Sequence, residues 1–170
     1  MDLKNMTPEH KDFLLNTYDI SEDDLRELAK DKSWKIRKRV AKNPNTPVKV
    51  LRKLAKDETW IIRGTIAISP NTPVDLLREL TKDKDPGVRA YIAYNPNTPK
   101  EVLQILKEDS HDIVRWEVAQ NPNTSIPILL GALTYEKSLK YPDSDVINSL
   151  YDNPKMPSFA KSIIETLFEV

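Results

Sequence analysis

Asn43-Pro44-Asn45-Thr46-Pro47 is a five-residue phrase that returns along the chain at a fixed interval. The later copies are Ser69-Pro70-Asn71-Thr72-Pro73, Asn95-Pro96-Asn97-Thr98-Pro99 and Asn121-Pro122-Asn123-Thr124, each starting 26 residues after the one before. A repeat of roughly 20 to 50 residues is typical of a solenoid, in which each unit packs on its neighbours. The phrase therefore predicts the architecture before any single residue suggests a function.

The phrase predicts a helix end followed at once by a helix start. Proline moves the residue before it out of the helical region, so Asn43 and its equivalents are expected to end helices. Asparagine also tolerates the left-handed conformation that often closes a helix. The threonine is expected to be the N-cap of the next helix, its hydroxyl accepting a backbone amide, and the following proline to be the first helical residue.

Apolar residues recur with the same period and predict two helices per repeat. Spacings of three and four residues place each set on one side of a helix. The first-helix columns are Leu25, Leu51, Leu77, Leu103 and Leu28, Leu54, Leu80, Leu106; the second-helix columns are Ile36, Ile62, Val88, Val114, then Val40, Ile66, Ile92, Val118, then Ala41, Ala67, Ala93, Ala119. Ser33, Thr59 and Asp85 are expected to cap the second helices. We expect first helices of about ten residues and second helices of about eight.

One solenoid domain is expected over residues 1–170, with irregular ends. Residues 1–16 predict an N-terminal capping helix whose Phe13, Leu14 and Leu15 cover the first repeat, and 17–120 predict four regular repeats, the first without the phrase. Residues 121–170 predict divergent repeats and a final capping helix. The phrase Asn153-Pro154-Lys155-Met156-Pro157 comes 32 residues after Asn121, so six extra residues are expected in a longer corner at 135–145, a possible binding lip.

Composition excludes several kinds of site. The chain has no cysteine, so disulfides, iron–sulfur clusters and thiolate zinc sites are excluded, and two histidines are too few for a histidine metal site; we expect no metal and no other cofactor. No apolar run approaches the roughly 18 to 20 residues of a membrane span, and no leader pattern opens the sequence, so we expect a cytoplasmic protein without membrane contact. Three glycines form no phosphate loop, and no nucleophile stands beside His111 in the sequence, so catalysis is not expected.

With these columns in place, the chain resembles the leucine-rich repeat variant family, whose repeat has Asn-Pro-Asn-Thr-Pro, two leucines three apart, an Asp and an apolar-Arg pair. Residues 43–120 match in three full copies, 17–42 in a copy without the phrase, and 121–157 partially. The family is similar to HEAT and armadillo solenoids, which implies an all-α, right-handed α-α superhelix. A branch with an iron–sulfur cluster on cysteines has no counterpart here. The resemblance otherwise implies a binding scaffold without a shared ligand.

An Asp and an Arg six residues apart recur in every regular repeat: Asp31/Arg37, Asp57/Arg63, Asp83/Arg89 and Asp109/Arg115. The first hypothesis is a structural ladder, similar to that of HEAT repeats, in which each corner Asp receives the second-helix Arg of its own or a neighbouring repeat. The alternative is a row of arginines offered to phosphates. Since every Arg comes with an acid, we favour the ladder.

The formal net charge is zero, but residues 32–56 hold ten cations and no acid: Lys32, Lys35, Arg37, Lys38, Arg39, Lys42, Lys49, Arg52, Lys53 and Lys56. Such a block can bind nucleic acid or another polyanion. However, Lys38, Arg39 and Lys42 belong to the second helix of one repeat, whereas Lys49, Arg52 and Lys53 belong to the first helix of the next. A solenoid places these sets on largely opposite surfaces, so a solvated charged face is the favoured interpretation.

Tyr91, Tyr94 and Trp116 occupy second-helix positions equivalent to Arg39, Lys42 and Lys38. Second helices usually line the concave face of such arrays, so this face is expected to be basic at one end and aromatic at the other. Exposed Tyr and Trp are favoured interaction anchors, although Trp116 could instead pack on the next helix pair. Trp34 and Trp60, at the first turn of their helices, are expected to pack at corners.

The leading hypothesis is a non-enzymatic scaffold that binds a protein or peptide segment through Tyr91, Tyr94 and Trp116, with Lys38, Arg39 and Lys42 beside them. Nucleic-acid binding through the block 32–56 is the alternative. A distant third is a DNA-repair enzyme, because alkylpurine DNA glycosylases also use HEAT-like arrays with Asp, Arg and Trp in the groove. The partner's identity and the oligomeric state do not follow from the sequence.

Overall fold

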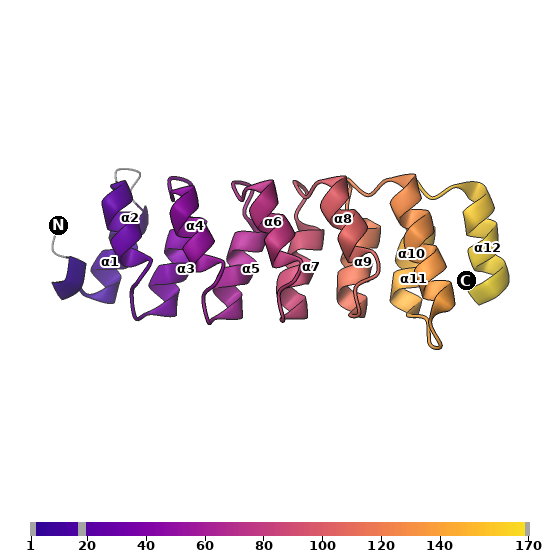
Figure 1. Ribbon diagram of the computed structural model, residues 1–170, viewed down its shortest axis with the longest axis horizontal. Helices are drawn as coiled ribbons and strands as arrows, with labels where there is room; N and C mark the ends of the chain where they lie inside the picture. The colour runs from indigo at the N-terminus through magenta and orange to yellow at the C-terminus, as the bar shows by residue number, and fades with distance from the viewer. Residues whose placement is uncertain (1–2, 17–19, 169–170) are drawn as a thin grey trace.

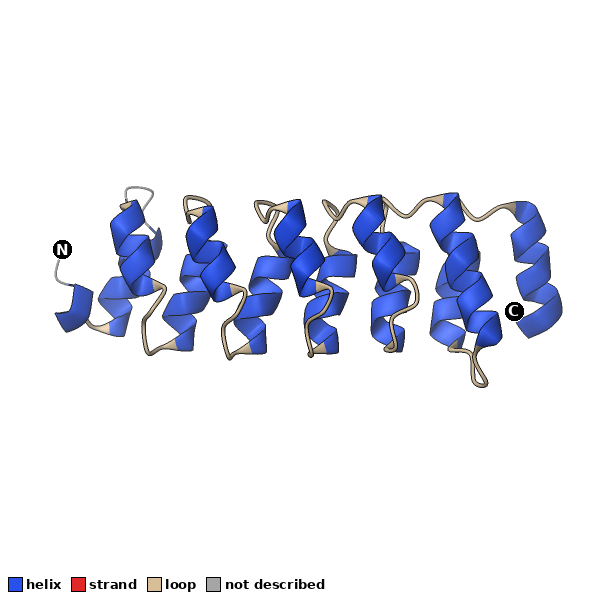
Figure 2. Cartoon of the chain, viewed as in Figure 1, coloured by secondary structure: helices blue, strands red, loops and turns tan. Residues whose placement is uncertain are grey.

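The computed structural model describes residues 3–16 and 20–168. Within these ranges the chain forms twelve α-helices and one short 3-10 helix, η1 (Leu3–Asn5), and contains no strand (Figure 2). The helices stack side by side along one direction, from α1 at one end to α12 at the other (Figure 1). The protein is therefore an all-α solenoid, as the repeated phrase predicts.

The helices alternate between two rows. The second-helix row consists of α1 (Pro8–Asn16), α3 (Trp34–Lys42), α5 (Trp60–Ile68), α7 (Pro86–Tyr94), α9 (Asp112–Gln120) and α11 (Ser144–Asp152). The first-helix row consists of α2 (Glu22–Leu28), α4 (Val48–Leu54), α6 (Val74–Leu80), α8 (Lys100–Leu106), α10 (Ile126–Ser138) and α12 (Ser158–Phe168). Consecutive second helices pack directly on one another, and most first helices contact the second helices on both sides.

The predicted apolar columns form the core. All the column leucines of the first helices are buried, as are the paired Ile and Val residues of the second helices. Ala41, Ala67, Ala93 and Ala119 are at most 1% exposed, and their small side chains allow the second helices to approach closely. Each helix pair thus buries its apolar face only because a neighbour covers it.

The threonine of the phrase does not cap the following helix, so that prediction was wrong. Pro47 is the N-cap of α4 and makes no side-chain cap hydrogen bond, and Pro73 and Pro99 stand in the same place before α6 and α8. The Thr46 hydroxyl points back and donates to the carbonyl of Val40, 2.6 Å away, in the last turn of the helix before it. The buried threonine therefore satisfies a helix C-terminus, where carbonyls lack partners.

The asparagine of the phrase does end its helix. Asn43, Asn95 and Asn121 are the C-caps of α3, α7 and α9, and Ser69 is the C-cap of α5. Their backbones are extended, with φ near −65° and ψ between 118° and 132°, and not left-handed. The following proline explains this conformation.

The second helices have 9 residues, close to the predicted length, whereas the regular first helices have 7 and are shorter than predicted. A 3-10 turn follows the first helix α4, because the amides of Lys56 and Asp57 donate to carbonyls three residues earlier. Ser33, Thr59, Asp85 and His111 are the N-caps of the second helices, as the register predicts.

The six extra residues lengthen a helix and not a corner, so the predicted longer corner at 135–145 was wrong. α10 has 13 residues where α8 has 7, whereas five residues separate α10 from α11 (139–143), as five separate α8 from α9 (107–111). Asp143 caps α11 by accepting the amide of Val146.

The two ends of the array are built differently. α1 lies in the second-helix row and packs on α3, with Leu15 buried; Phe13 is 68% exposed, so it does not cover the first repeat as predicted. α12 buries Ala160 and Ile164, but Lys161 occupies the column that holds Leu103 in α8 and Leu129 in α10. Lys161 is half-buried, so this column is not apolar in α12.

Candidate functional site

The Asp and Arg side chains form a ladder that links neighbouring repeats. Arg63 grips Asp83 of the next repeat through two hydrogen bonds, Nε to Oδ2 at 2.6 Å and Nη2 to Oδ1 at 2.9 Å. Arg37 with Asp57 and Arg89 with Asp109 repeat this geometry. Of the two pairings that the sequence left open, the structure thus uses the neighbouring repeat.

Each ladder residue also holds backbone in place. Arg63 Nη1 donates to the carbonyl of Asp57, at 2.8 Å, in its own repeat. Asp83 accepts the amide of Asp85, the N-cap of α7, at 2.9 Å. Asp31 and Asp57 likewise accept the amides of Ser33 and Thr59, so each corner Asp holds the N-cap residue of the following second helix.

Hydrogen bonds within the ladder favour the charged forms of its aspartates and arginines. Burial raises the pKa of the Asp83 carboxyl, but hydrogen bonds from Arg63 and from the Asp85 amide outweigh burial and hold that pKa below its ordinary value. The pKa values of Asp57 and Asp109 are lowered in the same way. The hydrogen bond to Asp83 in turn raises the pKa of Arg63. Arg37, Arg63 and Arg89 are each paired with an aspartate, so their guanidinium groups are not available to bind phosphates.

Two ladder residues lie outside the predicted set. At the N-terminal end Lys11 Nζ binds Asp31 Oδ2 at 2.7 Å. At the other end Arg115 Nε binds Glu136 of α10, which is fully buried. Lys11 lies 26 residues before Arg37, so the period alone could have revealed it; Glu136 lies in the extended α10, where the period no longer applies.

A second ladder, of asparagines, was missed by the sequence analysis. The Asn95 amide donates from Nδ2 to the carbonyl of Ala67, at 2.9 Å, at the end of the previous second helix. Its Oδ1 accepts the amide of Asn97 at 2.9 Å. Asn121 and Asn153 repeat both contacts. The recurring asparagine is therefore a link between repeats as well as a helix end, and Ser69 interrupts it.

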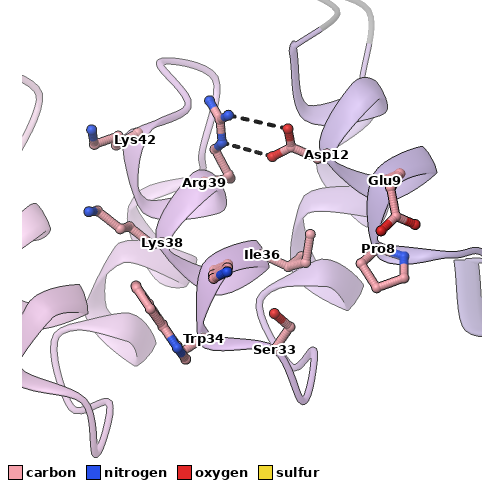
Figure 3. A pocket seen from close by; sticks show the side chains of 10 residues that line it. Pro8, Glu9, Asp12, Ser33, Trp34, Ile36, Lys38, Arg39 and Lys42 are labelled. Atoms are coloured by element: carbon pink, nitrogen blue, oxygen red, sulfur yellow. Dashed lines mark hydrogen bonds and ion pairs between the residues drawn. The ribbon is translucent and has the colours of Figure 1, made fainter.

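The predicted basic residues of α3 surround an open hollow of about 760 Å³ between α1 and α3 (Figure 3). Arg39 turns toward Asp12 and forms a two-pronged ion pair, with Nε 2.8 Å from Oδ1 and Nη2 3.2 Å from Oδ2. Lys38 lies over the ring of Trp34, 6.0 Å from its centroid. Lys42 is exposed and extends away from this pair. Arg39 is thus neutralised, whereas Lys38 and Lys42 keep their charge available.

The predicted aromatic residues divide between surface and core. Tyr94 is 55% exposed and Tyr91 is 39% exposed on α7. The Tyr91 ring packs on Gly64 of α5, where an added Cβ would lie only 2.8 Å from Cδ2. Trp116 of α9 is only partly exposed and packs against the C-terminal part of the core. The two tyrosines therefore belong to a surface, and Trp116 largely to the packing of the repeats, as its alternative interpretation holds.

The basic block is split as its position in the two rows predicts. Among its ten cations, Arg37 and Arg39 are ion-paired on α3, and Arg52 on α4 pairs with Asp75 and Glu79 of α6. α3 and α4 lie in different rows (Figure 1). The structure therefore does not bring the ten cations together into one patch.

Comparisons with protein-family models, with curated proteins and with solved structures returned no match for this chain. None of the helices in the described ranges has the length and apolar character needed to cross a membrane. In the same ranges, no three His, Cys, Asp or Glu side chains are grouped so that they could hold a metal ion.

Proposed function

We propose that the protein is a non-enzymatic scaffold that binds a segment of another protein along its second-helix row. The observation that carries the proposal is an exposed surface without charge over α5 and α7. The charged residues of these two helices are Arg63 and Arg89, and both are held in the ladder. Ile68 of α5 and Tyr91 and Tyr94 of α7 are exposed.

The row is suited to this role because its shape is fixed from within. Two ladders join consecutive second helices, so the surface is organised before a ligand arrives and little ordering is needed on binding. Exposed tyrosines give large contact areas at a low entropic cost. Close packing of second helices is also the arrangement expected of the inner face of a right-handed solenoid. Membership of the leucine-rich repeat variant family, and a cytoplasmic location, belong to the same proposal.

A peptide-display selection tests this function without knowledge of the natural partner. The protein is used as bait for a random peptide library, and the selected peptides are measured against the variant Tyr91→Ser/Tyr94→Ser. We expect binding to weaken by at least about tenfold, since anchor residues carry most of an interface's energy. The control is Val48→Ser/Val74→Ser, because these valines are exposed to a similar degree on the first-helix row. Equal binding to both double variants would contradict the proposal.

Nucleic-acid binding is the second candidate, and the lysines of α3 are the observation that favours it. It predicts a gel shift of single-stranded or duplex DNA that weakens steeply with salt and on charge reversal of Lys38, Arg39 and Lys42. Two features oppose it: Arg39 is paired with Asp12, and the neighbouring helices α5 and α7 present no cation outside the ladder. Absence of retention at low salt excludes this candidate.

A further inference from the structure

The charges on the second-helix row change sign along the array. α3 presents Lys35, Lys38 and Lys42, spaced by three and four residues so that they lie on one side of the helix. Lys35 and Lys42 are exposed, and no described residue forms an ion pair with any of the three. Glu9 of α1 lines the same hollow, so three available cations stand against one available carboxylate there. This end of the row carries net positive charge.

The rest of the row is different. The two helices that follow, α5 and α7, have no charge outside the ladder, as described above. Beyond them the exposed or half-buried ionisable residues are acidic: Asp112 and Glu117 on α9, then Asp145 and Asp152 on α11. The row therefore passes from basic through apolar to acidic.

We propose that the bound segment carries a cluster of acidic residues and, a short spacer away, a cluster of apolar residues, with the acidic part over α3 and the apolar part reaching across α5 to α7. This inference rests on the proposed function and names its ligand class. The lysines attract carboxylates, while Ile68, Tyr91 and Tyr94 offer apolar area. The acidic residues of α9 and α11 repel an acidic segment placed in the opposite direction, which fixes its orientation along the row.

Trp34 gives the acidic end a specific feature. Its ring is 39% exposed at the floor of the hollow, directly under Lys38. An apolar or aromatic residue flanked by acids can pack on this ring while its neighbours reach the lysines. A nucleic acid would find one stacking ring here but no cation on α5 or α7 outside the ladder, which is why the structure favours a peptide.

The spacing of the row sets the length of the ligand. Packed helices lie about 8 to 10 Å apart, so the distance from α3 to α7 is about 16 to 20 Å. An extended peptide advances about 3.3 Å per residue, and about five or six residues therefore separate the two clusters. A segment with its acids and apolar residues interspersed cannot satisfy both ends.

Synthetic peptides test the inference. The probe is a fluorescently labelled peptide with a run of glutamates, a Gly-Ser spacer of about five residues and a run of leucine and phenylalanine. It is made in both chain directions, beside a scrambled peptide of the same composition, a peptide with the apolar run alone, and an oligonucleotide. Fluorescence polarisation at low and high salt gives the affinities. We expect one direction to bind at least about tenfold more tightly than the scrambled peptide, with a gain that salt removes.

Matched variants locate the acidic end. Charge reversal of Lys35, Lys38 and Lys42 to Glu is expected to abolish that gain. The control reverses Lys49, Lys53 and Lys56, three exposed lysines on α4 or just after it, and is expected to leave the affinity within about twofold. Circular dichroism of each variant shows that the helices are retained.

Each outcome decides between the hypotheses. If the apolar peptide binds, depends on Tyr91 and Tyr94, and gains nothing from the acidic run, the proposed function stands and this inference is wrong. Equal effects of the α3 and α4 reversals also refute the inference. If the oligonucleotide binds through the α3 lysines and no peptide binds, the row is a nucleic-acid site and both proposals fail.

Discussion

Single residues of the phrase do more than end and start helices. The Thr98 hydroxyl donates to the carbonyl of Ile92 at 2.6 Å, and the Asn95 amide donates across to the previous repeat. Both side chains are almost completely buried. The buried polar groups are therefore acting as fixed connectors, and losing one leaves a backbone group without a partner.

Asn95→Ala is expected to destabilise the protein by about 1–3 kcal/mol, because it leaves the Ala67 carbonyl and the Asn97 amide without their buried partner. Urea unfolding followed by circular dichroism measures the change. The comparison is Asn97→Ala, two residues away, whose side chain is exposed and whose replacement should cost less than about 0.5 kcal/mol. Equal losses for the two variants would show that the asparagine ladder contributes nothing.

At the scale of one element, α10 shows how the array absorbs an irregular repeat. Its additional residues extend the helix until Glu136 faces Arg115, where the regular repeats use an Asp in the corner. The second carboxylate oxygen of Glu136 accepts the amide of Asp143, the N-cap of α11. The longer Glu136 side chain thus replaces the corner Asp in both of its contacts, with the arginine and with the N-cap amide. Arg115 also lies over the ring of Tyr135, 5.6 Å from its centroid.

Glu136→Gln tests this substitution of one acid for another. Arg115 is 4% exposed, so removal of its carboxylate leaves a buried charge unpaired and is expected to cost about 3–5 kcal/mol. Glu136→Asp is also expected to destabilise, because the shorter side chain cannot reach both Arg115 and the Asp143 amide. Thermal and urea unfolding give the losses, and Glu101→Gln on the exposed face of α8 provides the baseline. A variant as stable as that baseline would mean that Glu136 is not a ladder residue.

For the whole molecule, the period carried most of the prediction. It placed the two helices of each repeat, all the core columns and the caps of the second helices, because equivalent residues make the same buried contacts in every repeat. Besides the asparagine ladder, three features escaped it. The Asp–Arg spacing fits pairing within a repeat and between repeats equally well, a threonine hydroxyl can donate as well as accept, and six inserted residues can lengthen a helix as readily as a corner.

The candidate site was predicted less completely than the fold. The sequence placed Tyr91, Tyr94 and Lys42 on one row, and they lie there exposed. It could not show that Arg39 is paired with Asp12, since 27 residues separate them and no second copy of that pair exists. Nor could it decide between surface and core for Trp116, because that depends on the irregular repeat that follows.

The Asp–Arg ladder makes the stability of the array depend on pH. For Asp57, Asp83 and Asp109, burial raises the pKa, but hydrogen bonds from the paired Arg and from a corner amide leave it below the ordinary value. The unfolded chain then binds more protons than the folded one as pH falls below about 4, the ordinary range of Asp. The stabilisation is complete above that pH and is lost as pH falls through the lowered folded-state values.

We therefore expect the free energy of unfolding to drop steeply below about pH 4, with the junctions held by Asp57, Asp83 and Asp109 weakening together. Urea unfolding at neutral pH and at successively lower pH measures this. Asp83→Asn should be less stable at neutral pH and should lose less on acidification, because one titrating ladder carboxylate is gone. Asp23→Asn, which removes an exposed ion pair with Arg26, should follow the unmodified protein at every pH. If Asp83→Asn keeps the full acid dependence, the ladder is not what joins the repeats.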